Sequence, residues 1–232
     1  MYPDAIDKEL AREFAEDRED ELGEKVRIVL APARPSQWRK QDLDRVPSTW
    51  VNALAAGNAD EALAAIGWDG VASIVPRTLD QLRTRLAGLG VLLSRREAPS
   101  LLYFFIIEDE VIAYEGLLPG SGVSNVNEAS VPADLIAMQA LHDGWFDFFG
   151  GDTGWLPKAQ WREIGAEHPD GRTLIGISAK GSALVGFEPG DPGFPTRVLW
   201  PDDGRVDSPS SLFETIDEWN EEALSDAEEQ QR

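Results

Sequence analysis

Apolar residues along the chain recur at two spacings, one typical of helices and the other of strands. Ile6, Leu10 and Phe14 recur at every fourth position, so residues 5–22 are expected to form a helix with one apolar face. In residues 78–89, leucines recur at spacings of three and four, which predicts a second helix with a buried stripe that ends at a pair of glycines. The same signals predict further helices over residues 48–56, 60–66, 130–141 and 208–224.

Short apolar runs bounded by turn residues predict strands. Residues 101–107 and 111–114 flank an acidic turn and are expected to form a hairpin. The run LLYFFII at 101–107 has no alternating polar positions, so we expect it inside a sheet with both faces covered. A second hairpin and further strands are expected over residues 173–178, 183–187, 26–31 and 196–200. Hairpin-connected strands with helices before and after them predict an α+β fold, with a mainly antiparallel sheet flanked by helices.

A segment rich in glycine, serine and asparagine, residues 117–130, is the best candidate for a boundary within the chain. It separates an N-terminal α+β lobe over residues 1–120 from a second domain over residues 121–224, which an acidic tail over 225–232 follows. Residues 1–120 either fold separately or belong to the same domain as the rest, and the pattern leaves both interpretations open.

The excess negative charge is concentrated at the two ends of the chain. The formal net charge is −21, from 42 acidic and 21 basic residues. Residues 1–24 hold ten acids and three bases, and residues 202–232 hold eleven acids and two bases. Such a field repels nucleic acid and anionic membranes and attracts basic proteins. The alternative interpretation is that the acidic ends only aid solubility.

Compartment and redox chemistry follow from what the sequence lacks. There is no cysteine, which excludes disulfides and thiolate chemistry. The first twenty residues are acidic and have no apolar segment typical of a secretory signal, and the longest apolar run is far too short to cross a membrane. We therefore expect a cytoplasmic protein with no membrane partner.

No convincing catalytic set is visible. The two histidines, His142 and His168, belong to no HExxH pattern, and the chain has no GxSxG, GxGxxG or GxxxxGK[ST] motif. His142 is expected to end a helix and satisfy its carbonyl groups, and His168 to lie in a turn. We expect no enzyme, no cofactor and no metal, although 42 acids leave a carboxylate pair or a Mg²⁺ site open.

Five aromatic residues fall between positions 145 and 155, with glycines among them and a spacing that fits neither a helix nor a strand. Their rings either pack in the core or form a contact surface for a partner.

Residues 130–224 resemble the SUKH superfamily, which is named after fungal regulators of cell-wall synthesis. In that family a proline-started helix ending in a short turn before glycine precedes the sheet, and an apolar and acidic helix closes the domain. The corresponding segments here are 131–135 (VPADL), 141–144 (LHDG), 155–157 (WLP), 174–178 (LIGIS), 183–187 (ALVGF) and 211–216 (SLFETI). One departure is Asp143, which stands where the family usually has asparagine before the glycine.

The resemblance implies a bacterial immunity protein that binds and neutralises a toxin delivered between competing cells, in many cases a nuclease. Carboxylates that pair with the basic residues of such a toxin, and aromatic anchors, are the groups this function needs. The alternatives are a non-catalytic interaction scaffold or regulator of the same fold, and an enzyme that uses carboxylates alone or with Mg²⁺. The expected partner contacts, first choice, are Asp202, Asp203, Asp217, Glu218, Glu221 and Glu222. The second choice is Asp143, Asp147, Asp152, Trp145 and Trp155.

Overall fold

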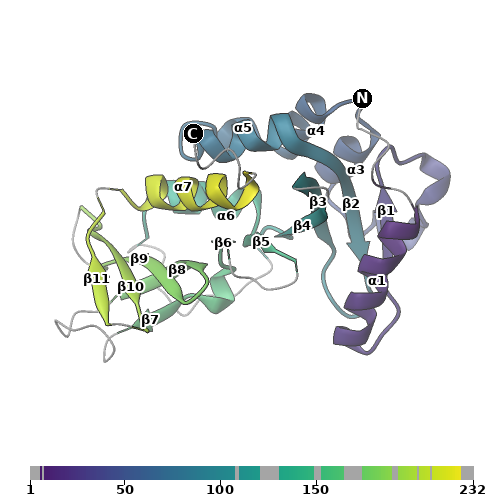
Figure 1. The fold of residues 1–232 in the computed structure, drawn as a ribbon. Helices are drawn as coiled ribbons and strands as arrows, with labels where there is room; N and C mark the ends of the chain where they lie inside the picture. The colour runs from purple at the N-terminus through teal and green to yellow at the C-terminus, as the bar shows by residue number, and fades with distance from the viewer. Residues whose placement is uncertain are drawn as a thin grey trace.

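The protein has a mixed α+β fold, as expected from the order of the elements (Figure 1). The structure, a computed structural model, describes residues 6, 8–107, 110–120, 131–148, 153–164, 174–189, 193–202, 204–209 and 211–225. The helices of these residues are α1 (Lys8–Leu22), α2 (Lys40–Leu43), α3 (Ser48–Ala55), α4 (Ala59–Ile66), α5 (Pro76–Arg85), α6 (Ala133–Leu141) and α7 (Leu212–Leu224), with 3₁₀ turns η1 (Pro35–Gln37), η2 (Trp68–Val71) and η4 (Lys158–Gln160). The strands are β1 (Arg27–Leu30), β2 (Leu86–Leu93), β3 (Ser100–Ile107), β4 (Glu110–Leu117), β5 (Trp145–Asp147), β6 (Gly154–Trp155), β7 (Arg162–Ile164), β8 (Leu174–Lys180), β9 (Ala183–Phe187), β10 (Thr196–Trp200) and β11 (Arg205–Asp207).

All of these strands belong to one antiparallel sheet. Its order is β1-β2-β3-β4-β5-β6-β8-β9-β10-β11, and β7 pairs with β8 beside this path. Strand β4 of the first expected lobe pairs with β5 of the second, where Glu115 lies opposite Phe146. The two segments on either side of residues 121–130 therefore share one sheet, and their buried side chains share one apolar core.

The two expected hairpins are confirmed. Strands β3 and β4 pair along their whole length, and β8 pairs with β9. The LLYFFII run lies in β3 between β2 and β4, and its first five side chains are completely buried. A continuous apolar strand therefore did indicate burial on both faces.

The helix expected over residues 78–89 is wrong in its second half. Helix α5 ends at Arg85, and Leu86 begins β2, in which every residue is buried. Leucines at 86 and 89 fit a helical stripe and a buried strand equally well, and pairing with β1 and β3 decides for the strand. Gly90 does not terminate a helix. A Cβ atom there would lie 2.9 Å from Ile28 Cγ2, so glycine allows close contact beside β2.

Helices cover the two faces of the sheet unequally (Figure 1). Helix α1 covers one face of β2–β4, where Phe14 packs against Leu102 and Phe104. Tyr103, which lies between these two residues in β3, points to the opposite face. It joins the larger core with α3, α4, α5, α6 and α7. A pocket lies on the face that α1 covers.

A cluster of aromatic rings lies at the centre of the larger core. Trp68 Nε1 donates to Tyr103 Oη at 2.9 Å, and this hydroxyl lies 2.7 Å from His142 Nε2. The carbonyl of Leu117 can only accept, so His142 Nδ1, 3.3 Å away, carries the hydrogen and Tyr103 donates to the other nitrogen. A Cβ atom on Gly116 would lie 2.6 Å from the imidazole, so only glycine fits beside it. The ring therefore holds β3, β4 and the end of α6 together.

His142 is completely buried, and burial lowers its pKa to about 3. A histidine whose folded-state pKa is depressed stabilises the fold above pH 6.5 and loses this contribution as the pH falls towards 3. We expect unfolding experiments to show a loss of roughly 3 kcal/mol between pH 7 and pH 4 from this group. The difference between the wild type and His142→Gln isolates the contribution of this residue. Imidazole NMR signals of His142 that titrate between pH 5 and 8 would contradict the prediction.

Helices α5 and α7 are joined through a buried carboxylate. Asp217 of α7 accepts hydrogen bonds from the backbone amides of Arg77 and Thr78 (3.0 and 2.7 Å) and from Thr78 Oγ1 (2.7 Å). These amides lie in the first turn of α5 and have no partner within the helix, and a negative charge is favourable at this end. Asn220 Nδ2 also donates to Thr78 Oγ1. The contact fixes the end of the chain to its first half.

Replacing Asp217 by asparagine is expected to lower the free energy of unfolding by about 2 kcal/mol, because the amide group turns a donor towards other donors. The measurement is the urea midpoint at an unchanged m-value. Glu218→Gln, an equal change of charge on the next residue, is the control and should leave the midpoint unchanged. Equal midpoints for the two variants would show that Asp217 does not cap α5.

Candidate functional site

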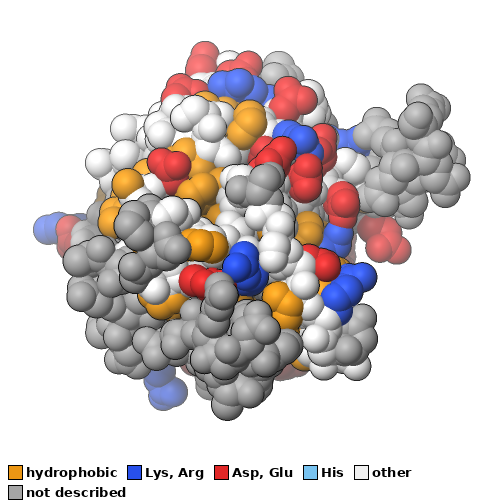
Figure 2. Space-filling model, turned by 90° about the vertical axis from the view of Figure 1, so that its left-hand side faces the viewer, with side chains coloured by type: hydrophobic (Ala, Val, Ile, Leu, Met, Phe, Trp, Pro, Cys, Tyr) orange, Lys and Arg blue, Asp and Glu red, His pale blue; other side chains and the backbone are white. Residues whose placement is uncertain are grey.

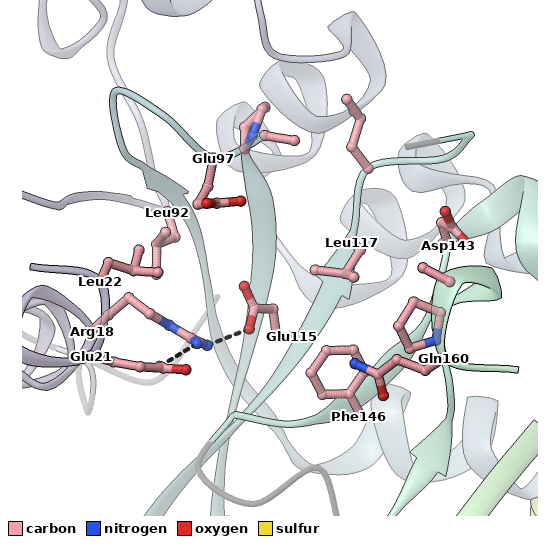
Figure 3. A pocket seen from close by; sticks show the side chains of 15 residues that line it. Arg18, Glu21, Leu22, Leu92, Glu97, Glu115, Leu117, Asp143, Phe146 and Gln160 are labelled. Carbon is pink, nitrogen blue, oxygen red and sulfur yellow. Dashed lines mark hydrogen bonds and ion pairs between the residues drawn. The ribbon is translucent and has the colours of Figure 1, made fainter. Parts of the chain in front are cut away.

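A pocket of about 500 Å³ lies on the face of the sheet that α1 covers (Figure 3). The end of α1 forms one wall, β4 and the segment that joins β2 to β3 form the floor and rim, and η4 with Pro157 forms the opposite wall. Helix α1 covers only the part of this face next to β1–β4, so the sheet surface beyond Leu22 remains accessible. The pocket is where the two segments of the chain meet on this side.

A buried ion pair forms the floor of the pocket. Glu115 lies opposite Leu102 and Phe146 in the sheet, and its side chain shares the face of α1. Arg18 of α1 points towards it and donates from Nη2 to Glu115 Oε2 at 2.5 Å, while Nη1 donates to Glu21 at 2.6 Å (Figure 3). The Arg18 guanidinium also lies 4.3 Å from the centre of the Phe148 ring. Burial raises the pKa of the Glu115 carboxyl, and the charge of Arg18 opposes this shift.

The described lining of the pocket is acidic. Glu21, Glu97, Glu115 and Asp143 contribute carboxylates, and Arg18 is the one basic residue among the described lining residues. Asp143 is completely buried and accepts a hydrogen bond from the Lys158 amide at 3.0 Å. Carboxylates that outnumber basic groups at a partly apolar wall favour a cationic ligand.

Arg45, which lies between α2 and α3, holds the backbone segment that carries Glu97. Arg45 donates to the carbonyls of Ser94 (2.6 Å) and of Glu97, which holds the connection between β2 and β3. The Glu97 side chain itself is exposed and forms no ion pair with another described residue. It is therefore available at the rim.

Helix α1 continues the acidic surface away from the pocket. Glu13, Asp17 and Asp20 follow one another at spacings of four and three, so they share one exposed face of the helix. None of the three forms an ion pair with another residue in the described part of the chain. Glu9 and Glu16, by contrast, both pair with Arg12. The acidic face of α1 is thus only partly neutralised.

The acids of α7, the first choice from the sequence, are placed differently. Arg77 of α5 pairs with Glu218 and Glu221 at 3.1 and 3.3 Å, and Lys180 of β8 pairs with Glu222. Asp217 is buried as the cap of α5. Figure 2, which views the molecule from the side of β8–β11, shows acidic and basic side chains of the described residues next to one another.

Three of the second-choice residues lie in the interior. Trp145 and Trp155 are completely buried and stack on each other with ring centres 5.2 Å apart, and Asp143 is equally buried. Their expected role as exposed partner contacts, like that of Asp217, is therefore corrected. Of the two alternatives for these tryptophans, packing in the core or a contact surface for a partner, the structure shows packing in the core.

The remaining candidates are surface residues or lie outside the described residues. Asp147 is half-buried at the end of β5, opposite Tyr114. Asp202 is exposed and accepts a hydrogen bond from Ser182 at 2.5 Å. Asp152, Asp203 and His168 lie outside the described residues.

Sequence reasoning missed Arg18, Glu97 and Glu115. The available signal was a glutamate inside an otherwise apolar strand, in the run VIAYEGL at 111–117. A charge at such a position is retained at a cost unless it is paired. Its partner Arg18 lies 97 residues earlier in the chain, where no local pattern connects the two.

Comparison of the chain with models of known protein families, with curated proteins and with solved structures found no match. The resemblance to the SUKH superfamily therefore stays a prediction. Among the described residues, no group of three or more histidine or carboxylate side chains could hold a metal ion. None of the described helices is both long and apolar enough to span a bilayer.

The pKa of Glu115 should respond in opposite directions to changes at its two neighbours. Removing the positive charge by Arg18→Met raises the pKa further, whereas Glu21→Gln removes a nearby negative charge and lowers it. Carbon-detected NMR titration of the carboxyl groups measures both shifts. Because the folded-state pKa lies above its ordinary value, ionisation of Glu115 costs stability as the pH rises through it. Shifts of the same sign in both variants would contradict the ion-pair geometry.

Proposed function

We propose that this chain is an immunity protein that binds and neutralises a basic toxin, through an acidic surface formed by α1 and the pocket beside it. The observation that carries the proposal is the placement of unpaired carboxylates. Glu13, Asp17 and Asp20 on α1 and Glu97 at the pocket rim form no ion pairs with other described residues. The acids of α7, in contrast, are paired within the molecule.

Such an acidic surface can attract a basic protein electrostatically. Carboxylates that have no internal partner keep their charge available for a basic protein, which speeds encounter and fixes the orientation of the complex. A nuclease toxin has a basic surface for its anionic substrate, so an acidic protein that covers this surface blocks the active site. The charge of the chain as a whole, −21, supports this choice of partner over nucleic acid.

Two other functions make different predictions. A scaffold or regulator of the same fold would bind a basic protein without suppressing any toxicity. An enzyme is favoured by one observation, the presence of Glu115 and Asp143 in one pocket with the pKa of Glu115 raised by burial. In an enzyme, Glu115→Gln would abolish turnover, whereas a binding protein has no turnover to lose.

The function is tested with the polypeptide encoded directly upstream of this chain. Co-production of the chain should protect bacteria from that polypeptide, and the purified proteins should form a one-to-one complex that inhibits the toxin. The dissociation constant should rise about tenfold or more between 50 and 300 mM salt, because screening weakens long-range attraction. Toxicity that persists at equimolar amounts of the chain contradicts the proposal.

The binding surface is tested with two matched triple variants. Glu13→Gln, Asp17→Asn and Asp20→Asn remove three charges from α1, and Glu218→Gln, Glu221→Gln and Glu222→Gln remove three from α7. The α1 triple variant is expected to lower the association rate constant about tenfold, and the α7 triple variant to change it less than twofold. Both carry the same net charge, so equal effects would mean that only the overall charge matters.

A further inference from the structure

Resting on the function proposed above, we propose that the pocket between α1, β4 and η4 receives a single arginine or lysine side chain of the basic partner. The pocket would then supply the central anchor of the complex, and the acidic face of α1 its surrounding electrostatic contacts.

The charge of the pocket is not cancelled by its own arginine. Arg18 is shared by Glu21 and Glu115, which leaves these two carboxylates with one positive charge between them. Glu97 adds a further carboxylate at the rim without an ion pair to another described residue. One more cation can therefore enter, whereas an anionic ligand would be repelled.

The walls fit the aliphatic part of a basic side chain. Leu22, Leu92, Leu117, Leu118 and Phe146 line the pocket between the carboxylates. Long basic side chains bury their methylene groups along apolar surfaces and keep the charged end among polar groups. A purely apolar ligand would cover the carboxylates without replacing their hydration, which is unfavourable.

A buried hydroxyl adds acceptor capacity on the same face. Ser100 pairs with Leu92 on one side and Leu117 on the other, and both of these residues line the pocket. Its side chain shares their face of the sheet, and the residue is only 2% exposed. The hydroxyl is close enough to Glu115 to lower the pKa of that carboxyl, yet Oγ forms no hydrogen bond of normal geometry with any described group. The Ser100 hydroxyl can accept a hydrogen bond from an ammonium or guanidinium group as well as donate one.

The molecule already holds one guanidinium in the same way. Arg18 donates to two carboxylates of the pocket and lies over the Phe148 ring, so the pocket wall shows how a cation with an aliphatic chain is bound here. The proposed ligand is a second such group on the open side of the pocket.

The test uses the full chain and two short blocked peptides, acetyl-Gly-Arg-Gly-amide and the same peptide with citrulline. Citrulline has nearly the shape of arginine but carries no charge. In NMR titrations at low salt, the arginine peptide should bind at least about tenfold more tightly, a difference of about 1.4 kcal/mol. The backbone amides of Glu97, Leu118 and Gln160 should shift. Equal affinity for the two peptides, or shifts confined to α1, would overturn the proposal.

Matched variants locate the effect. Glu97→Gln should weaken binding of the arginine peptide several-fold, while Glu218→Gln, the same change on α7 away from the pocket, should leave it within twofold. Free spermidine forms a third arm, and binding of spermidine far more tightly than the peptide would identify a small-molecule site and overturn the anchor.

The outcomes also separate this proposal from the proposed function. Binding of the arginine peptide in the pocket of a chain that neutralises no toxin leaves the cationic site in place and removes the immunity function. Neutralisation of a toxin by a chain whose pocket ignores the arginine peptide removes the anchor alone.

Discussion

A buried layer of aromatic rings holds the distant parts of this chain together. Trp68 contacts Tyr103, Trp145 and Trp155, and the Tyr103 hydroxyl bonds to His142. These residues come from both sides of the expected boundary at 117–130, so neither side can bury its own rings without the other. Large rings fill the face of the sheet towards α3–α7, whereas α1 covers only the β1–β4 part of the opposite face, beside which a pocket lies.

The distribution of ion pairs decides which of the many acids keep an uncompensated charge at the surface. Long-range pairing partly neutralises α7, since Arg77 of α5 pairs with Glu218, which lies 141 positions later, and with Glu221. On α1, Arg12 pairs with Glu9 and Glu16, Lys25 pairs with Glu19, and Arg18 is turned inward to Glu115. The two acidic ends of the chain therefore look alike in composition but differ in how their carboxylates are paired. Exposed pairs such as those of α7 add little stability, yet they reduce the charge that would attract a basic protein.

Local signals predicted the elements and could not predict the site. The continuous apolar run of β3 and the hairpins needed only neighbouring residues, and both were confirmed. Leu86 and Leu89 satisfy two periodicities, so only the pairing of β2 with its neighbours determined the strand. The sequence suggests Asp217 as a contact for a partner protein, whereas the residue binds the first turn of α5, far away in the sequence. The irregular spacing around Trp145 and Trp155 left core and contact surface open because burial depends on segments such as η2 that no local pattern connects to them.

We propose that a basic protein binds to α1 and the adjacent pocket. Amide hydrogen exchange of the full chain, free and in complex with the proposed toxin, tests this binding mode. Protection should increase in α1, around Glu97, at residues 117–118 and in η4, with α7 and β8–β11 unchanged. Protection confined to α7 and the neighbouring strands would contradict it.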